Sequence, residues 1–309
     1  MREQPPARQL DERDRRAETL RNDATRRDFL RRSAVAAMAA GLGPSAWAAE
    51  PEPLKIGIRA ASLKLAGTPD VFQVAARIPG IRGVEVQATA GQPNLRDPDT
   101  VRQYKREADR WGLQVPSLAG IWDRGVTIHS PNAADSVLAS IRAAEMLGAG
   151  VLLAAFFQQD APVMTDESSY GPIVSLLQRV AGRAADAGIV IGLENSLSPA
   201  DNKKLVDLVN HPAIAVYYDP HNMDFYGHGA QAVPGIQLLG RDRICMVHVK
   251  NGSQLIEAPG PIDWPAAFAA LRQTGYHGWY VYETGHASTE DAVADTKKNT
   301  VFLKRHCSP

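Results

Sequence analysis

Residues 189–220 read IVIGLENSLSPADNKKLVDLVNHPAIAVYYDP, and they show most clearly the pattern that predicts the fold. It contains an apolar run (189–194), a stretch of helical period (200–209) and a second apolar run (213–219). Short apolar runs rich in β-branched residues predict strands, while apolar residues spaced three and four apart predict an amphipathic helix. A strand, a helix and a second strand in this order predict two parallel strands joined by a right-handed crossover.

The same alternation extends along the chain in both directions. The expected strands are 55–59, 83–87, 113–119, 150–156, 189–194, 213–219, 244–250 and 279–283. The expected helices are 69–76, 98–111, 134–147, 170–186, 200–209, 230–239, 264–273 and 288–305. Several of these helices end at a glycine, as is typical of a C-cap: Gly112, Gly148, Gly188 and Gly275. Eight such units in about 260 residues favour a single closed (β/α)8 TIM barrel of the α/β class, spanning residues 50–309, over an open sheet.

The first 49 residues do not follow this pattern and predict a leader. The paired arginines Arg26 and Arg27 precede a short apolar stretch that ends in Ala-Trp-Ala at 46–48. A basic region, a short apolar stretch and a small-residue end are typical of an export signal, and the arginine pair resembles the twin-arginine signal. We expect residues 1–49 to be a disordered twin-arginine leader that is cleaved. The alternative is a disordered basic arm followed by an amphipathic helix.

This leader predicts a periplasmic or secreted protein, exported already folded, with the twin-arginine machinery as a transient partner. No stable membrane anchor is expected, because the apolar stretch is shorter than the roughly 20 strongly apolar residues of a membrane span. The leader holds ten of the 34 Lys and Arg residues and seven of the 34 Asp and Glu residues, leaving 24 basic and 27 acidic ones. This mildly acidic balance does not indicate a nucleic-acid partner. Cys245 lies inside an expected strand, so a disulfide with Cys307 is not expected.

Polar residues stand at the ends of four consecutive expected strands: Glu194, Asp219, His248 and Glu283. The alternation of side chains along a strand places each on the inner face, at the mouth where such barrels have their active sites. One such residue alone is more often a solvated cap or a satisfied core residue. Four at equivalent positions would repel one another unless a cation bound them. Asp219 followed by Pro220 is also a typical helix start, which is compatible with a site.

One imidazole and three carboxylates form a mostly oxygen donor set. Such a set favours Mn²⁺ or Mg²⁺, with Co²⁺, Ni²⁺ and Zn²⁺ as alternatives. The sequence does not distinguish among these ions.

The strand-end motifs resemble those of a known family. They read IGLENS (191–196), YYDPHN (217–222), VHVKN (247–251) and YVYET (280–284), and the run into the last strand reads DWPAAFAALRQTGYHGW (263–279). They resemble the sugar phosphate isomerase/epimerase family of xylose isomerase-like barrels, and the similarity covers about residues 54–305. The motifs are specific for the family but not for one substrate.

The resemblance implies roles for these residues. Ketose epimerases of the family hold a metal with a Glu, an Asp, a His and a Glu at these strand ends, which correspond to Glu194, Asp219, His248 and Glu283. It also implies that Glu194 and Glu283 form the catalytic acid/base pair. Removing a proton next to a carbonyl leaves an enediolate, whose charge a cation stabilises. Return of the proton to the opposite face gives an epimer, and return to the adjacent carbon gives an isomer.

The chain departs from the epimerase pattern where the substrate would bind. Those enzymes often have D-x-x-H after the sixth strand, whereas Asn222 stands in the last position here, and residues 250–261 contain no arginine. Binding of an ordinary free ketohexose is therefore in doubt. The expected substrate-binding residues share a place at the mouth: Asn222, Lys250, Glu85, Trp122, His129 and Gln158. Trp122 or Phe157 could stack on a sugar face, although loop packing explains either equally well.

We therefore expect an exported, metal-dependent isomerase or epimerase that acts on a sugar or keto-sugar, with a small carbohydrate or polyol as its partner. Two alternatives use the same site: β-elimination by a keto-sugar dehydratase or lyase, and carbohydrate binding without turnover. The nuclease branch of the superfamily is not expected, because no D-x-H follows His248. The sequence is compatible with a homo-oligomer.

Overall fold

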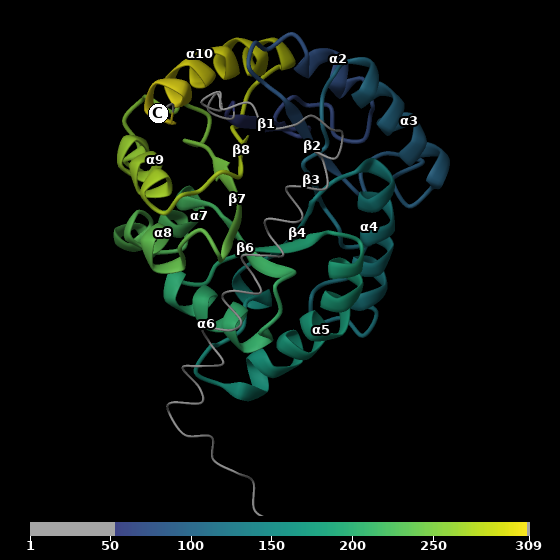
Figure 1. Ribbon diagram of the computed structural model, residues 1–309, viewed down its shortest axis with the longest axis vertical. Coiled ribbons are helices and arrows are strands. Elements are labelled where there is room, and N and C mark those ends of the chain that lie inside the picture. The colour runs from purple at the N-terminus through teal and green to yellow at the C-terminus, as the bar shows by residue number, and fades with distance from the viewer. Residues whose placement is uncertain (1–52, 308–309) are drawn as a thin grey trace, which may run out of the picture.

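The protein is a closed eight-stranded barrel. The computed structural model describes residues 53–307, so the predicted leader at 1–49 lies outside the described residues. Strands β1 to β8 pair in chain order, all in parallel, and β8 pairs with β1. Figure 1 shows helices α2 to α10 as a layer around the strands. The expected (β/α)8 barrel is confirmed.

The strands lie close to their expected positions. They are β1 (Lys55–Arg59), β2 (Gly83–Gln87), β3 (Ser117–Ala119), β4 (Val151–Phe156), β5 (Val190–Asn195), β6 (Ile214–Tyr218), β7 (Ile244–Val249) and β8 (Trp279–Tyr282). The expected strand 113–119 was too long, since only its last three residues form β3. Pro116 has no N–H to donate to the ladder, and Gln114 makes only an isolated bridge to Gly83.

The helices fill the intervals between strands. They are α2 (Val71–Ala75), α3 (Pro98–Arg110), α4 (Ala133–Leu147), α5 (Glu167–Asp186), α6 (Pro199–Val209), α7 (Pro220–Phe225), α8 (Pro234–Leu239), α9 (Trp264–Gln273) and α10 (Thr289–Cys307), with 3₁₀ turns η1 (Gln158–Asp160) and η2 (Gly229–Gln231). The expected helix 230–239 is confirmed only in part: Pro234 is the first residue of α8, and Gly229–Gln231 form the separate turn η2 before it. None of the helices within residues 53–307 is long and apolar enough to cross a membrane.

Local signals at helix ends are realised as expected. Asp219 is the N-cap of α7: its side chain accepts a hydrogen bond from the Asn222 backbone, and Pro220 is the first helical residue. The four expected glycines have positive φ values: Gly112 (65°), Gly148 (74°), Gly188 (68°) and Gly275 (74°). Asp219 is thus held by the start of a helix exactly where β6 ends at the barrel mouth.

The inside of the barrel is packed by alternate residues of the strands. These residues form a cluster separate from the core between strands and helices: Ala119, Val151, Leu153, Val190, Ala215, Tyr217, Met246 and Val281. The alternation continues into Glu194, Asp219, His248 and Glu283, as expected. The lower barrel is therefore a packed apolar core, and the same strand faces become polar towards their carboxyl ends.

A β-bulge on β7 disturbs this alternation once. Val216 pairs with Ile244 and Tyr217 pairs with Met246, so Cys245 is the extra residue and joins the interior cluster. A Cβ on Gly192 would lie 2.7 Å from the Cys245 Sγ, which explains the glycine in β5. Cys245 and Cys307 are both free cysteines.

Candidate active site

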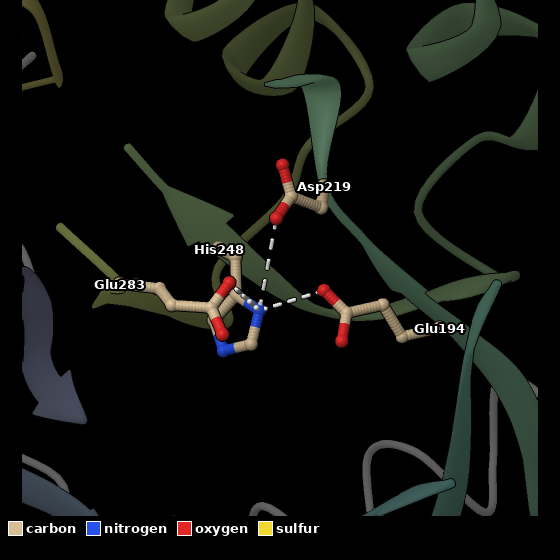
Figure 2. Close-up of side chains that lie close together, drawn as sticks. All are labelled: Glu194, Asp219, His248 and Glu283. Atoms are coloured by element: carbon tan, nitrogen blue, oxygen red, sulfur yellow. Dashed lines mark hydrogen bonds and ion pairs between the residues drawn. The ribbon is translucent and has the colours of Figure 1, made fainter. Parts of the chain in front are cut away.

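Four polar residues meet at the carboxyl ends of β5 to β8. Glu194 belongs to β5 and His248 to β7, whereas Asp219 and Glu283 directly follow β6 and β8. One potential ligand atom from each lies within 4.8 Å of the others. Figure 2 shows the three carboxylates around one edge of the His248 ring, with Glu194 and Glu283 on opposite sides. The structure brings together the four residues that the sequence predicts as metal ligands.

The Nδ1 atom of His248 lies at the centre of this group. It is 3.0 Å from Glu194 Oε1, 3.4 Å from Glu283 Oε2 and 3.9 Å from Asp219 Oδ2. The side chains of His248 and Asp219 are fully buried, whereas that of Glu283 is 18% exposed. The cluster is therefore closed below and open to solvent on the Glu283 side.

The donor set fits a divalent cation. One imidazole nitrogen with carboxylate oxygens suits Mn²⁺ or Mg²⁺ and also accommodates Zn²⁺. Within residues 53–307, the buried Asp219 Oδ2 accepts no well-directed hydrogen bond, although the Lys250 ammonium lies 2.7 Å away. A buried carboxylate oxygen needs a positive charge beside it. Lys250 supplies that charge here, and a divalent ion held by the cluster would share this oxygen with it.

The local charges also fit a divalent cation. Besides the three ligand carboxylates, the buried Glu85 contributes a fourth. Lys250 Nζ lies 2.6 Å from Glu283 Oε2, and Arg59 forms ion pairs with both Glu283 and Glu85. Metal ligation requires a neutral imidazole, so four carboxylates and two cationic side chains leave two negative charges for a divalent ion to balance.

Glu85 lies beneath the cluster, against the other edge of the His248 ring. Its Oε1 is 3.2 Å from His248 Nε2 and 3.5 Å from Arg59 Nε. Its Oε2 accepts hydrogen bonds from Ser117 Oγ at 2.7 Å and from Tyr217 OH at 2.8 Å. Because Glu85 has no exposed surface, the expectation that it contacts substrate at the mouth is not supported by its position.

The pKa values of this pair move in opposite directions. Burial by itself raises the pKa of Glu85, but the charge and hydrogen bond of His248, with help from Arg59 and Ser117, lower it to about 2. Burial by itself lowers the pKa of His248, but Glu194 and Glu85 raise it to about 9. The carboxylates around the ring thus favour a positive charge at this point, as expected of a cation site.

Three residues of this region are not among the site residues predicted from the sequence. Arg59 ends β1, Ser117 begins β3 and Tyr217 lies two residues before Asp219 on the same face of β6. Arg59 carries the same signal as Glu194, because both are charged residues at the end of a strand. The roles of Ser117 and Tyr217 depend on Glu85 and could not be read from their own positions.

Two predicted substrate-binding residues do contact the four-residue cluster. Asn222 Nδ2 donates a hydrogen bond to Glu194 Oε1 at 3.0 Å, and its backbone N–H donates to Asp219. The Lys250 ammonium bridges Asp219 and Glu283. Asn222 and Lys250 are therefore placed to influence the cluster directly.

The remaining predicted residues lie in loops that surround the mouth. The half-buried Trp122 donates from its indole to the Ala155 carbonyl at 2.7 Å. The exposed His129 ring lies 3.1 Å from the Asp160 carbonyl. Gln158 is exposed, and its backbone N–H donates to Ser196 Oγ at 2.8 Å. None of these contacts joins Trp122, His129 or Gln158 to the four-residue cluster.

An aromatic pair connects two of the mouth loops. Phe157 stacks on Tyr226 with ring centroids 5.4 Å apart and an interplanar angle of 19°. Burial, followed by the charges of Glu194 and Asp219, raises the pKa of Tyr226. Tyr226 is therefore near the carboxylates, and the sequence offered no signal for it beyond its place shortly after β6.

Comparisons with known proteins agree with this arrangement. The family model for the xylose isomerase-like TIM barrel matches residues 72–306. An L-ribulose 3-epimerase from a Methylomonas species is 28% identical over 183 residues, which are 56% of this chain and 60% of that protein. A 2-epi-5-epi-valiolone 7-phosphate 2-epimerase from an Actinoplanes species is 32% identical over 133 residues, which are 42% and 48% of the two chains. The matched part is less than two thirds of either curated relative.

Solved structures share the fold over a larger part of the chain. The crystal structure of a D-allulose 3-epimerase from a Methylomonas species, in complex with D-allulose, superposes with a TM-score of 0.66. It is 21% identical, and the match covers 83% of this chain and 98% of that one. At this level of identity the likeness concerns the fold.

Proposed function

The chain belongs to the xylose isomerase-like TIM barrel family, and from this premise we propose that it is a divalent-metal-dependent isomerase or epimerase of sugars or keto-sugars. Both relatives with matching sequences are named epimerases, one of L-ribulose and one of a valiolone phosphate. Because the matches cover less than two thirds of either relative, the activity is proposed for this chain and not carried over from them.

One observation carries the proposal: Glu194 and Glu283 approach the same point from opposite sides. Both lie beside His248 Nδ1, at 3.0 Å and 3.4 Å, and come from β5 and from the end of β8 (Figure 2). Two carboxylates on opposite sides of a bound carbon can remove a proton from one face and return one to the other. This is the arrangement that inversion at a carbon requires.

The proposed reaction is proton transfer next to a carbonyl. One of Glu194 and Glu283 takes the proton, and the electrons of the broken C–H bond form the C=C bond of an enediolate while the carbonyl oxygen gains the negative charge. The other glutamate, which must enter the reaction as the carboxylic acid, gives its proton to the opposite face. This restores the carbonyl in an epimer and leaves the two glutamates with their protonation states exchanged. If a single glutamate returns the proton to the former carbonyl carbon, and the proton of the neighbouring hydroxyl moves to the former carbonyl oxygen, the product is instead an aldose–ketose isomer.

The residues that would hold the metal are Glu194, Asp219, His248 and Glu283. A divalent ion bound there supplies the positive charge that stabilises the enediolate oxygen. Mn²⁺ and Mg²⁺ suit the oxygen-rich donor set best, and Co²⁺, Ni²⁺ and Zn²⁺ are alternatives. Asn222 orients Glu194 by its hydrogen bond, and Lys250 is placed beside both Asp219 and Glu283 to meet an oxygen of the substrate.

Export is part of the same proposal. Residues 1–49 act as a cleaved twin-arginine leader and residues 50–309 as the periplasmic or secreted enzyme, which takes non-phosphorylated sugars.

Changing Arg26 and Arg27 to lysine should leave unprocessed protein in the cytoplasm, as measured by cell fractionation and by the mass of the protein. The matched control changes Arg31 and Arg32 to lysine and should be exported. A wild-type protein of full length in the cytoplasm would contradict export.

Solvent-exchange NMR in deuterated water tests the activity. Ketoses, keto-glycosides and inosose-type compounds are incubated with the Mn²⁺-loaded protein. We expect deuterium at a carbon next to the carbonyl, with the carbon skeleton intact, and no uptake with Glu194→Gln or Glu283→Gln. Loss of water or of an aglycone would instead indicate a lyase, and binding without exchange would indicate a carbohydrate-binding protein. Normal exchange by both variants would refute the assigned roles.

A further inference from the structure

The His248 ring has two differently occupied edges. Its Nδ1 faces the carboxylates of Glu194, Asp219 and Glu283, whereas its Nε2 faces Glu85 Oε1 at 3.2 Å. A neutral imidazole carries its proton on only one nitrogen, and the other nitrogen then has the free lone pair that a metal needs. The group that accepts from Nε2 therefore determines whether Nδ1 is free.

Glu85 is itself held in place by hydroxyl groups from two other strands. Ser117 of β3 and Tyr217 of β6 donate to its Oε2 at 2.7 Å and 2.8 Å, so that Oε1 is directed at His248. The Tyr217 ring also packs on the His248 ring, with centroids 4.3 Å apart. A carboxylate with no exposed surface and these contacts has one available orientation.

We propose that Glu85 is a positioning residue, which holds the proton of His248 on Nε2 and thereby directs the Nδ1 lone pair at the metal, with Ser117 and Tyr217 fixing Glu85 itself. This inference rests on the proposed function, because it assigns His248 as a ligand. Metal-bound histidines are commonly oriented by such a second partner, and its loss typically weakens metal binding by about tenfold to a hundredfold.

The test measures metal binding rather than turnover. Metal-depleted wild-type protein and variants are titrated with Mn²⁺ by calorimetry, and their Co²⁺ absorption spectra are compared. Glu85→Leu should raise the Kd for Mn²⁺ by about tenfold to a hundredfold and change the Co²⁺ spectrum. Glu85→Gln should have a smaller effect, because its amide oxygen still accepts from Nε2 while the hydroxyls of Ser117 and Tyr217 turn to accept from its NH₂ group.

Two further variants separate positioning from general stability. Tyr217→Phe keeps the ring that packs on His248 but removes the hydroxyl that holds Glu85, so it should raise the Kd by less than Glu85→Leu. Val180→Ala, in the buried layer of α5, should lower the melting temperature of the metal-depleted protein without changing the Kd. If the role of Glu85 were purely structural, Glu85→Leu would behave like Val180→Ala, with a lower melting temperature and an unchanged Kd.

The outcomes distinguish this inference from the proposed function. A wild-type Kd and Co²⁺ spectrum in Glu85→Leu would overturn the positioning role alone. If Glu85→Leu does not fold, wild-type values in both Glu85→Gln and Tyr217→Phe would overturn it. A wild-type protein that binds none of the divalent ions would overturn the proposed function and this inference with it. A graded rise in Kd from Gln to Leu, with Val180→Ala unchanged, would support the inference.

Discussion

The inside of the barrel has a lower apolar part and an upper polar part, both built by the same faces of the same strands. On β7, Met246 packs in the apolar interior cluster, and His248 two residues later lies among three carboxylates. On β5, Val190 and Glu194 differ in the same way. Side chains two apart share a face, so the height along the strand separates a residue of the packed core from one of the proposed catalytic cluster.

This comparison predicts that losing the metal should affect activity far more than folding. Chelation should abolish turnover in the solvent-exchange assay, and Mn²⁺ should restore it, because the enediolate charge loses several kcal/mol of stabilisation. The far-UV circular dichroism should be unchanged, since the lower barrel packs without the site. The melting temperature should rise again on metal addition. Full turnover in the presence of chelator, with no metal detected by elemental analysis, would show that the reaction does not require a metal.

The second prediction addresses the apolar part. Met246→Ala should lower the free energy of unfolding by about 2–5 kcal/mol, because it leaves a cavity in the packed interior. Urea denaturation measures this loss. The turnover number should stay at the wild-type value once the folded fraction is accounted for. An unchanged free energy of unfolding with a reduced turnover number would contradict the assignment of Met246 to the stabilising part of the barrel.

The third prediction concerns the boundary of the polar part. Asn222→Ala removes the hydrogen bond to Glu194 Oε1, and hydrogen bonds to charged groups contribute about 1.5–3 kcal/mol. The value of kcat/KM should therefore fall by roughly tenfold to a hundredfold, since 1.4 kcal/mol corresponds to a factor of ten. The exposed Gln231→Ala should have no effect and serves as the control. Equal kcat/KM values for both variants would show that the hydrogen bond from Asn222 to Glu194 does not contribute to activity.

The smallest expected effect tests the packing around the bulge. Gly192→Ala would place a methyl group 2.7 Å from Cys245 Sγ and 3.1 Å from Tyr217 Cβ. Overpacking of this kind costs about 1–3 kcal/mol, measured by urea denaturation. Adding Cys245→Ala should recover part of this loss, because it removes the nearer contact. A double variant no more stable than Gly192→Ala would place the strain at Tyr217 instead.

Much of the fold could be predicted because each βα unit carries local signals. Strand and helix periods, glycine caps and the Asp219–Pro220 pair all describe neighbouring residues, and they led to a closed barrel with few errors. The errors occurred at Pro116 and Pro234: β3 begins only after Pro116, and α8 begins at Pro234 instead of continuing from residue 230.

The four-residue cluster could be predicted for the same reason, whereas the residues around it could not. Alternation along single strands placed Glu194, Asp219, His248 and Glu283 at the mouth. Glu85 follows the same rule but lies in β2, and its role depends on which edge of the His248 ring it meets. No pattern within one strand contains that information.

Local periodicity in the sequence was enough to predict the order of strands and helices, the inward direction of the four cluster side chains and their place at the strand ends. The tertiary structure alone decided that Glu85 lies below His248, that Arg59 joins Glu85 to Glu283, and that Tyr217 and Ser117 complete the network. These contacts join residues from β1, β2, β3, β6, β7 and the end of β8. They exist only because closure of the barrel brings strands from distant parts of the chain to one axis.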